Sequence, residues 1–297
     1  MPILDREEYI EQFYFFQTLR ERIKASIATQ DVLERIDQEI LATTKLPMAI
    51  QFLATEIKQS GLLSTGFKIL SHYFTPFQAF IIKSTEDENR KFSIDTGLHV
   101  LEKMAKYHAD SPLPSGLFVF QFEILSRNKL GYEEGITAMA NDPMYSQEWK
   151  DFILFVSKQI GLVEFAEFVY LRSEYYLEVE RKQDPLYEPP VQPLFASKEG
   201  RIAKANLGRD PFFLFAALQR QLNYPEVPRS TEKETPKDEI MVVRQRVNDL
   251  EIRLKLIEAE VKGNVDLSLF AKPAILENLP KSDGFADYTT SLQAGKF

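Results

Sequence analysis

A run of apolar residues near one end most constrains how this 297-residue chain can fold and assemble. Between Ile240 and Val261 the apolar residues recur at alternating spacings of three and four, which are the a and d positions of a heptad repeat: Ile240, Val243, Val247, Leu250, Leu254, Ile257 and Val261. Such a stripe stays buried when helices wind around one another in a left-handed supercoil. The segment therefore predicts a coiled coil, and with it self-association.

The charges beside this stripe predict the orientation of the helices. In a parallel assembly the g position of one helix faces the following e position of its neighbour, so Arg246 meets Glu251 and Arg253 meets Glu258. An antiparallel pair would instead place Arg246 near Arg253, and these two charges repel. Exposed pairs contribute only about a few tenths of a kcal/mol each, so they select the orientation more than they stabilise it. We expect parallel helices.

The number of helices follows from the mixture of residues in the stripe. Val, Ile and Leu share the a and d positions, which weakens the preference for a dimer. Residues 246–251 and 253–258 resemble the Arg-h-x-x-h-Glu motif of short trimeric coiled coils, where h is apolar. We expect a homotrimer, with a dimer as the second choice. An amphipathic helix that packs on its own domain would show the same stripe and is the third interpretation.

Composition limits the classes of partner. The formal net charge of −8 and the pI near 5.2 argue against a general affinity for nucleic acid or for an anionic membrane. The chain has no cysteine, which excludes disulfides, thiolate nucleophiles and cysteine-ligated metals. The first residues lack the pattern of a signal peptide, and no apolar run is long enough to span a bilayer. We expect a soluble, cytoplasmic protein without a membrane partner, for which nucleic acid is an unlikely partner.

Residues 1–183 predict a helical domain. Start and stop signals recur along them: Asp5 with Glu8 predicts a capping box, Thr75 precedes a proline, and Gly61 ends an apolar stripe. About ten helices with short connections indicate an all-α fold, either a multi-helix bundle or an irregular stack of helical hairpins. Residues 118–122 alternate as a strand would, but their neighbours continue a buried helix, so we predict helix there.

The remaining chain divides into four segments. Residues 184–222 begin with four prolines in ten residues and end in a short aromatic helix, and we expect both to pack on the helical domain. Residues 223–237 are polar and predict a flexible linker, and residues 238–263 form the coiled coil. Residues 264–297 have scattered apolar side chains without a period, which predicts a mostly disordered tail that either carries short docking peptides or has no binding role.

Few residues suggest chemistry. Asp95, His99 and Glu102 share one face of a predicted helix and could in principle ligate a metal, but a di-metal bundle needs paired Glu-x-x-His motifs, which the sequence lacks. Neither a Gly-x-Ser-x-Gly turn nor a phosphate-binding loop is present. We therefore predict no catalytic residue, no cofactor and no metal, and interpret this helix face as a polar surface.

One basic segment lies between residues 198 and 209. This segment contains one acid, Glu199, and four basic residues: Lys198, Arg201, Lys204 and Arg209. Such a cluster can bind phosphate, RNA or an acidic partner. The simpler interpretation is a solvated segment that pairs with the acidic surface of its own domain.

These patterns together predict a non-enzymatic intracellular scaffold or adaptor. It would self-assemble through Ile240–Val261 and present its helical domain in several copies to an unidentified protein partner, gaining avidity without new contacts. One alternative is a helical enzyme with a cleft in residues 1–182, which burial of Asp95, His99 or Glu102 beside a pocket would support. The other is a regulatory nucleic-acid or phosphate binder that uses residues 198–209.

Overall fold

The structure is a computed structural model that describes residues 3–87 and 89–229. These residues form thirteen α-helices and one short 3-10 helix, and no strand occurs among them: α1 (Arg6–Lys24), α2 (Thr29–Ile36), η1 (Asp37–Glu39), α3 (Leu46–Ser60), α4 (Leu63–Ile69), α5 (Pro76–Glu86), α6 (Ile94–Ala109), α7 (Pro114–Arg127), α8 (Tyr132–Ala140), α9 (Gln147–Gln159), α10 (Phe165–Leu171), α11 (Glu174–Gln183), α12 (Ser197–Ala205) and α13 (Pro211–Leu222). The all-α prediction is confirmed for this part of the chain. The predicted coiled coil and tail lie outside the described residues.

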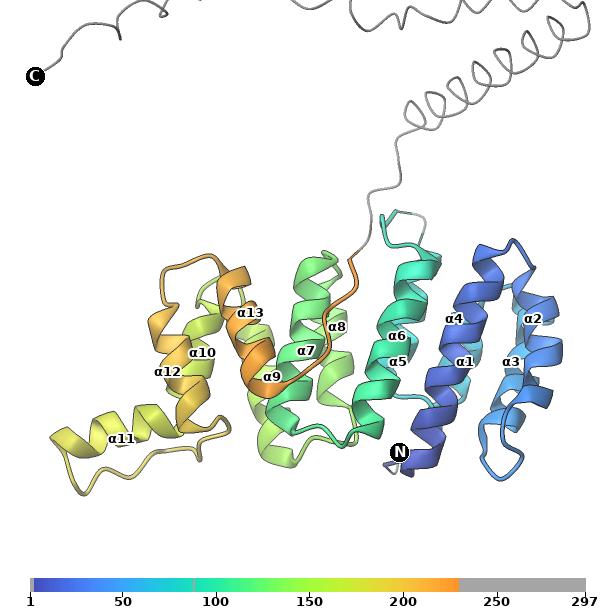
Figure 1. Cartoon of the computed structure of the whole chain (residues 1–297). Helices are drawn as coiled ribbons and strands as arrows, with labels where there is room; N and C mark the ends of the chain where they lie inside the picture. Colours follow the sequence, from blue (N-terminus) through green and yellow to red (C-terminus); the bar gives the residue numbers. More distant parts are fainter. Residues whose placement is uncertain (1–2, 88, 230–297) are drawn as a thin grey trace, which may run out of the picture. The chain divides into compact units, whose positions relative to one another are not determined.

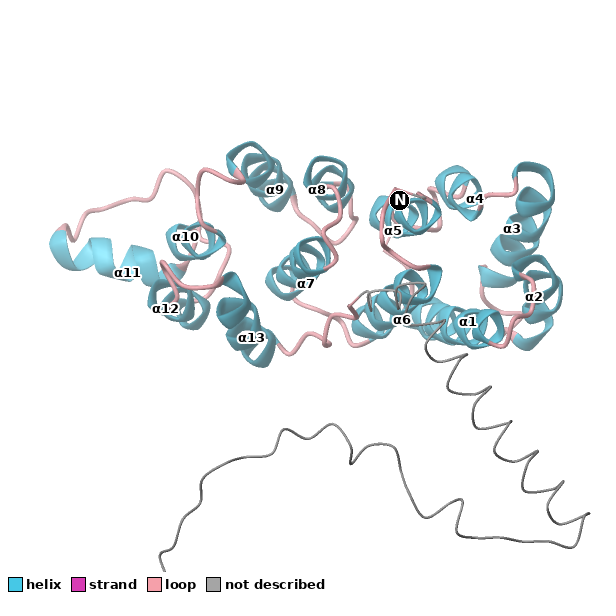
Figure 2. Ribbon diagram, turned by 90° about the horizontal axis from the view of Figure 1, so that it is seen from above, coloured by secondary structure: helices cyan, strands magenta, loops and turns pink. Residues whose placement is uncertain are grey.

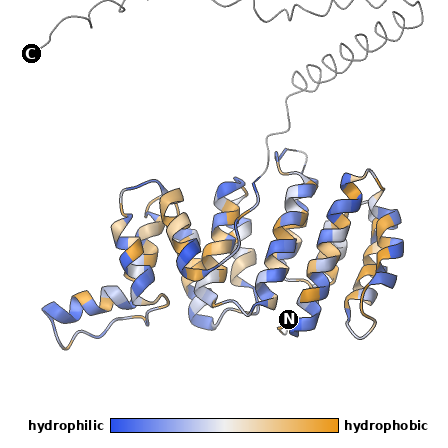
Figure 3. Cartoon of the chain, viewed as in Figure 1, coloured by the Kyte–Doolittle hydropathy of each residue, from blue (hydrophilic) through white to orange (hydrophobic). Residues whose placement is uncertain are grey.

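The helices pack in two rows (Figure 2). One row runs α3, α4, α5, α8, α9, and the other runs α2, α1, α6, α7, α13, α12. Apolar and polar residues alternate along the helices, as expected when one face of a helix is buried and the other is not (Figure 3). The described residues belong to one compact unit, and Phe195, Ala203 and Phe215 are buried in the same core as the helices before them.

Helices α1 and α6 form an extensive antiparallel pair, although four helices separate them in sequence. Arg20 pairs with Glu102 at 2.9 Å and Lys24 with Asp95 at 3.0 Å. At the opposite end, the Arg6 Nε donates to the carbonyl of Ala109 at 3.1 Å. The chain therefore leaves α1, builds α2 to α5, and returns beside its starting helix.

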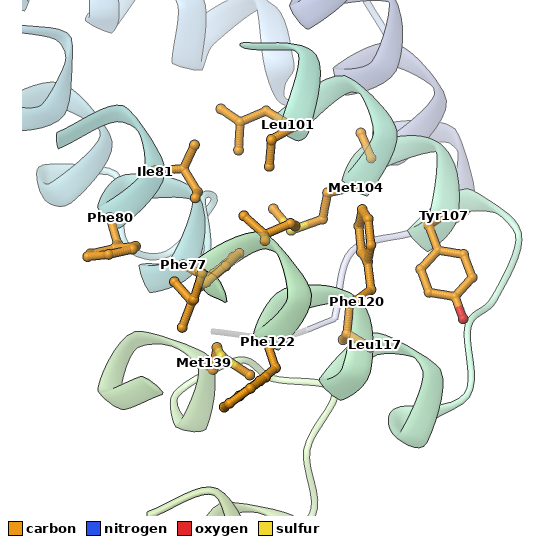
Figure 4. Close-up of a cluster of buried hydrophobic side chains, with 14 of the residues drawn as sticks. Phe77, Phe80, Ile81, Leu101, Met104, Tyr107, Leu117, Phe120, Phe122 and Met139 are labelled. Atoms are coloured by element: carbon orange, nitrogen blue, oxygen red, sulfur yellow. The ribbon is translucent and has the colours of Figure 1, made fainter. Parts of the chain in front are cut away.

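One cluster of buried apolar side chains extends from Phe15 in α1 to Val227 after α13. Side chains of α5, α6, α7 and α8 meet in the cluster of Figure 4, with Phe77, Met104, Phe120 and Met139 among them. Residues Gly116 to Leu125 of α7 are all buried, so this helix is enclosed by protein on every side. That burial explains why residues 118–122 look strand-like in sequence, and the prediction of helix there is confirmed.

Two of the predicted helix-end signals are found in the structure, and one is not. Gly61 ends α3 with a left-handed φ of 74°, and Thr75 forms a capping box with Gln78 at the start of α5. The capping box predicted for α1 is wrong, because the Asp5 side chain makes no cap hydrogen bond. The Glu8 carboxylate is buried and instead accepts from the Lys45 amide and the Tyr73 hydroxyl, both at 2.7 Å.

After residue 183, part of the basic segment and the start of the predicted linker have more structure than the sequence suggested. The basic segment forms a helix, α12, so the aromatic helix α13 is not the only one there. The described part of the predicted linker, residues 223–229, packs on the helices, with Tyr224 and Val227 buried. The Tyr224 hydroxyl donates to the Glu123 carboxylate and to the Phe215 carbonyl, which holds this extended segment against α7 and α13.

Candidate functional site

An apolar groove among the described residues has a cavity volume of about 570 Å³, within the range typical of ligand pockets. One wall is a face of α9, because a spacing of three and four residues places Glu148, Asp151, Phe152 and Phe155 on the same side of a helix. Phe152 is buried, whereas Phe155 is 52% exposed. The α9 wall of the groove therefore combines one buried and one exposed aromatic side chain.

The second wall comes from the end of α10. Phe168 and Leu171 lie on this helix, and the Phe155 and Phe168 rings meet edge to face at 6.2 Å. Leu171 is 44% exposed. Arg172 caps the helix C-terminus and contributes the only cation among the groove residues.

The third wall is the Pro-rich segment between α11 and α12 (Figure 1), which supplies Pro190, Val191 and Gln192. Its position is set just downstream, where the amides of Leu194 and Phe195 both donate to the Arg172 carbonyl, at 2.8 and 3.0 Å. Phe195 is buried, and its ring centroid lies 5.3 Å from that of Trp149. The extended segment is therefore a fixed wall of the groove, anchored through one buried aromatic side chain.

The charges of the groove are arranged around its apolar centre. The Arg172 guanidinium lies over the Phe152 ring at 5.3 Å, and its Nε is buried without a hydrogen-bond partner among the described residues. Burial lowers the pKa of Arg172 below its usual value, while the charge of Glu148 opposes that shift. Glu148 and Asp151 are exposed on the same face of α9. The groove thus offers a cation with an unused donor inside and two carboxylates at its rim.

The structure places all four basic residues of the predicted anion or partner site on the surface, two of them beside tyrosine rings. Lys198, Arg201, Lys204 and Arg209 are all exposed. Arg201 lies over the Tyr175 ring at 5.4 Å, and the Lys204 Nζ lies 5.3 Å from the centre of the Tyr170 ring. Glu199 is buried and accepts from Gln221, which leaves only cations on this exposed face of α12. Arg201 also lies 4.0 Å from Glu178, a contact with the protein's own acidic surface.

The polar face of α6 is occupied by structural contacts. Glu102 is buried and Asp95 is partly exposed, and both pair with cations of α1. Burial, aided by the charges of Arg20 and Lys103, lowers the pKa of His99. None of these three residues lines the groove or the second cavity of similar volume, between α4, α5 and α8. No cluster of three or more potential metal ligands occurs in the described part of the chain.

A buried polar cluster was missed by the sequence analysis. His108 stacks on Tyr9 with ring centroids 4.8 Å apart, and neither of its ring nitrogens has a hydrogen-bond partner in the described structure. Burial lowers the pKa of His108, and the nearby Asp142 opposes this. Asp142 is fully buried and accepts from Gln121. Isolated polar residues in apolar helices could have suggested such a cluster, but the pairing of distant helices creates it.

Comparison with known proteins adds no further constraint: no family model, curated protein or solved structure matches this chain. None of the described helices is both long and apolar enough to cross a bilayer. The residues predicted to drive assembly, including Leu250 and the Arg246–Glu251 pair, lie outside the described residues.

Proposed function

We propose that this chain is a non-enzymatic, cytoplasmic scaffold or adaptor. It assembles through Ile240–Val261 as a parallel homotrimer, or failing that a dimer, and presents its helical domain in several copies to a protein partner. The observation that carries the proposal is the unbroken heptad stripe with attractive charges at its flanks.

The groove of the helical domain supplies a surface to present. It places exposed apolar side chains, Phe155, Leu171 and Val191, around one cavity. Clustered apolar side chains at a concave surface are typical of peptide-binding sites. Linking several such grooves raises the apparent affinity for a multivalent partner by about 10²–10⁴ without any new contact at each groove.

Solution mass tests the assembly. Light scattering is expected to give three times the chain mass for the full chain and one chain mass for a version that ends before Pro236. Leu250→Asp places a charge in the stripe and is expected to abolish assembly, because burying an unpaired carboxylate in a coiled-coil seam is strongly unfavourable. Asn248→Asp adds the same charge at an outward b position and is expected to leave the trimer intact.

A monomeric full chain would remove the main support of the scaffold proposal. So would equal effects of Leu250→Asp and Asn248→Asp, because only the first variant replaces an apolar seam residue by a charge. Residues 240–261 would then be assigned to a helix docked on its own domain.

An anion-binding surface on α12 is a second candidate, favoured by the stacking of Arg201 and Lys204 on tyrosine rings. Cations held beside aromatic faces suit single-stranded nucleic acid or another polyanion. A labelled single-stranded RNA titrated at several salt concentrations provides the test. Replacing both cations by glutamine is expected to reduce the salt slope by about 0.7 per cation removed. Lys158→Gln, at an exposed position on α9, is the control, and salt-insensitive binding by the unaltered chain would reject this candidate.

A further inference from the structure

The second cavity lies between α4, α5 and α8, which are consecutive helices of one row (Figure 2). Its volume is about 570 Å³, within the range of sites that bind small molecules. The wall from α5 is apolar over most of its length, because Pro76, Ala79 and Phe80 lie three and four positions apart and share one face of the helix. Phe67 and Phe74 also line the cavity. A molecule that fills it therefore needs an apolar body.

The wall from α4 is more polar. Ser64 and Lys68 are four positions apart and share one face of this helix, and Ser71 follows in the turn after it. The Lys68 ammonium is exposed and forms no ion pair within the described residues. This wall therefore offers two hydroxyls and one cation to a molecule in the cavity.

The acids around the cavity leave Lys68 without a counterion. Glu134 of α8 is the one acid among the described residues that line the cavity, and it pairs with Lys83, whose Nζ donates to both carboxylate oxygens at 3.1 and 3.2 Å. Glu133 lies outside the lining. Glu86, at the end of α5, accepts from two backbone amides of the first turn of α4. A negative group on the ligand would therefore complement Lys68.

We infer that this cavity binds a small organic anion with an apolar body, such as an aromatic ring system. The apolar body lies against the α5 wall, and the anionic group lies beside Lys68, where the hydroxyls of Ser64 and Ser71 donate hydrogen bonds to it. The inference goes beyond the scaffold proposal and does not depend on it, because the cavity shares no residue with the groove of α9 and α10 or with the heptad stripe.

Two fluorescent dyes that share one ring system test the need for an anion in the full-length protein. Anilinonaphthalenesulfonate carries a sulfonate, whereas phenylnaphthylamine lacks it and is neutral. Lys68→Gln is expected to weaken binding of the sulfonate by about two- to fivefold, the contribution of an exposed ion pair, and to leave binding of the neutral dye unchanged. Lys106→Gln is the matched control, because it removes the same charge from an exposed position on α6 outside the cavity.

Tryptophan substitutions test the location. Ala79→Trp fills the cavity from the α5 wall and is expected to prevent binding of both dyes. Leu171→Trp adds the same side chain to the groove of α9 and α10 and is expected to leave both affinities unchanged. Because Ala79 packs against the core, Ser71→Trp at an exposed position of the lining is a second blocking variant. Circular dichroism establishes that each variant is folded.

Equal effects of Lys68→Gln and Lys106→Gln on the sulfonate would overturn the choice of an anion. Dye binding that persists in the folded cavity variants, or that only Leu171→Trp removes, would overturn the location, and the absence of saturable binding of the sulfonate would overturn the whole inference. Solution mass, measured in parallel, separates these outcomes from the assembly proposal. A monomer that binds the sulfonate through Lys68 supports the cavity and refutes assembly, whereas a trimer that binds neither dye refutes the cavity alone.

Discussion

Removal of one buried hydroxyl tests how α1 is joined to the helices that follow it. The Tyr73 hydroxyl donates to the Glu8 carboxylate at 2.7 Å, and both side chains are buried, with 2% and 7% of their surface exposed. The other oxygen of Glu8 accepts from the Lys45 amide at 2.7 Å. One carboxylate thus connects α1 with the start of α3 and with the turn before α5.

Tyr73→Phe keeps the ring and deletes only the donor. A hydrogen bond to a charged group contributes about 1.5–3 kcal/mol, and its loss leaves a buried carboxylate oxygen without that partner. We therefore expect the free energy of unfolding to fall by about 2–3 kcal/mol. For a domain of this size each kcal/mol lowers Tm by about 2–4 °C, so Tm should fall by about 4–12 °C.

Urea denaturation followed by circular dichroism measures the difference, and the slope of the free energy against urea should not change. Tyr14→Phe is the matched control, because the Tyr14 hydroxyl also donates to a carboxylate, Glu39, at 3.0 Å, but its side chain is 39% exposed. Its expected cost is below about 0.5 kcal/mol. If both variants lose the same stability, burial does not strengthen the contact between Tyr73 and Glu8 and the reasoning is refuted.

The same residue predicts a dependence on alkaline pH. Burial, followed by the hydrogen bond to Glu8, raises the pKa of Tyr73. The unfolded chain releases this proton near pH 10, while the folded protein retains it. The contribution of Tyr73 to stability is therefore complete below pH 10 and declines above it, and Tyr73→Phe should show a shallower decline than the unaltered chain.

Two further substitutions test buried contacts between helices. Because burial lowers the pKa of His108, the contribution of this residue to stability is present above pH 6.5 and is lost at up to about 1.4 kcal/mol per pH unit as the pH falls. His108→Phe should therefore flatten this acid loss in urea titrations. An acid loss equal to that of the exposed control His72→Phe would contradict the attribution of the loss to His108. A Cβ on Gly200 would lie 2.1 Å from the Ser173 Oγ, so Gly200→Ala should cost about 1–3 kcal/mol. Gly161→Ala, where the space is open but φ is 88°, provides the comparison, and a Gly200→Ala variant as stable as the unaltered chain would contradict the close packing.

The sequence by itself determined the class of fold and several helix boundaries. Gly61 and the Thr75-Pro76 pair end and start helices for reasons contained within a few residues, namely a left-handed φ and a side chain that caps its own helix. Asp210 likewise starts the aromatic helix α13, its carboxylate accepting from the Phe212 amide. Such interactions do not depend on distant parts of the chain, so a local pattern suffices to predict them.

Tertiary structure decided the uses of the polar side chains. Asp5 and Glu8 have the spacing of a capping box, but Glu8 bonds to Lys45 and Tyr73, partners that helix packing brings near it. Similarly, Asp95 and Glu102 resemble a ligand set in sequence but pair with cations of α1. A carboxylate has several competing partners, and only the positions of distant helices select among them.

The candidate site shows the same division. Sequence patterns identified the heptad stripe, the basic segment and the Pro-rich segment, because each is continuous in the chain. The groove joins residues from Glu148 to Gln192, and the stacking of Lys204 on Tyr170 joins two different helices. No local spacing encodes these contacts, because they arise only when α9, α10, α12 and the extended segment bury their apolar faces together.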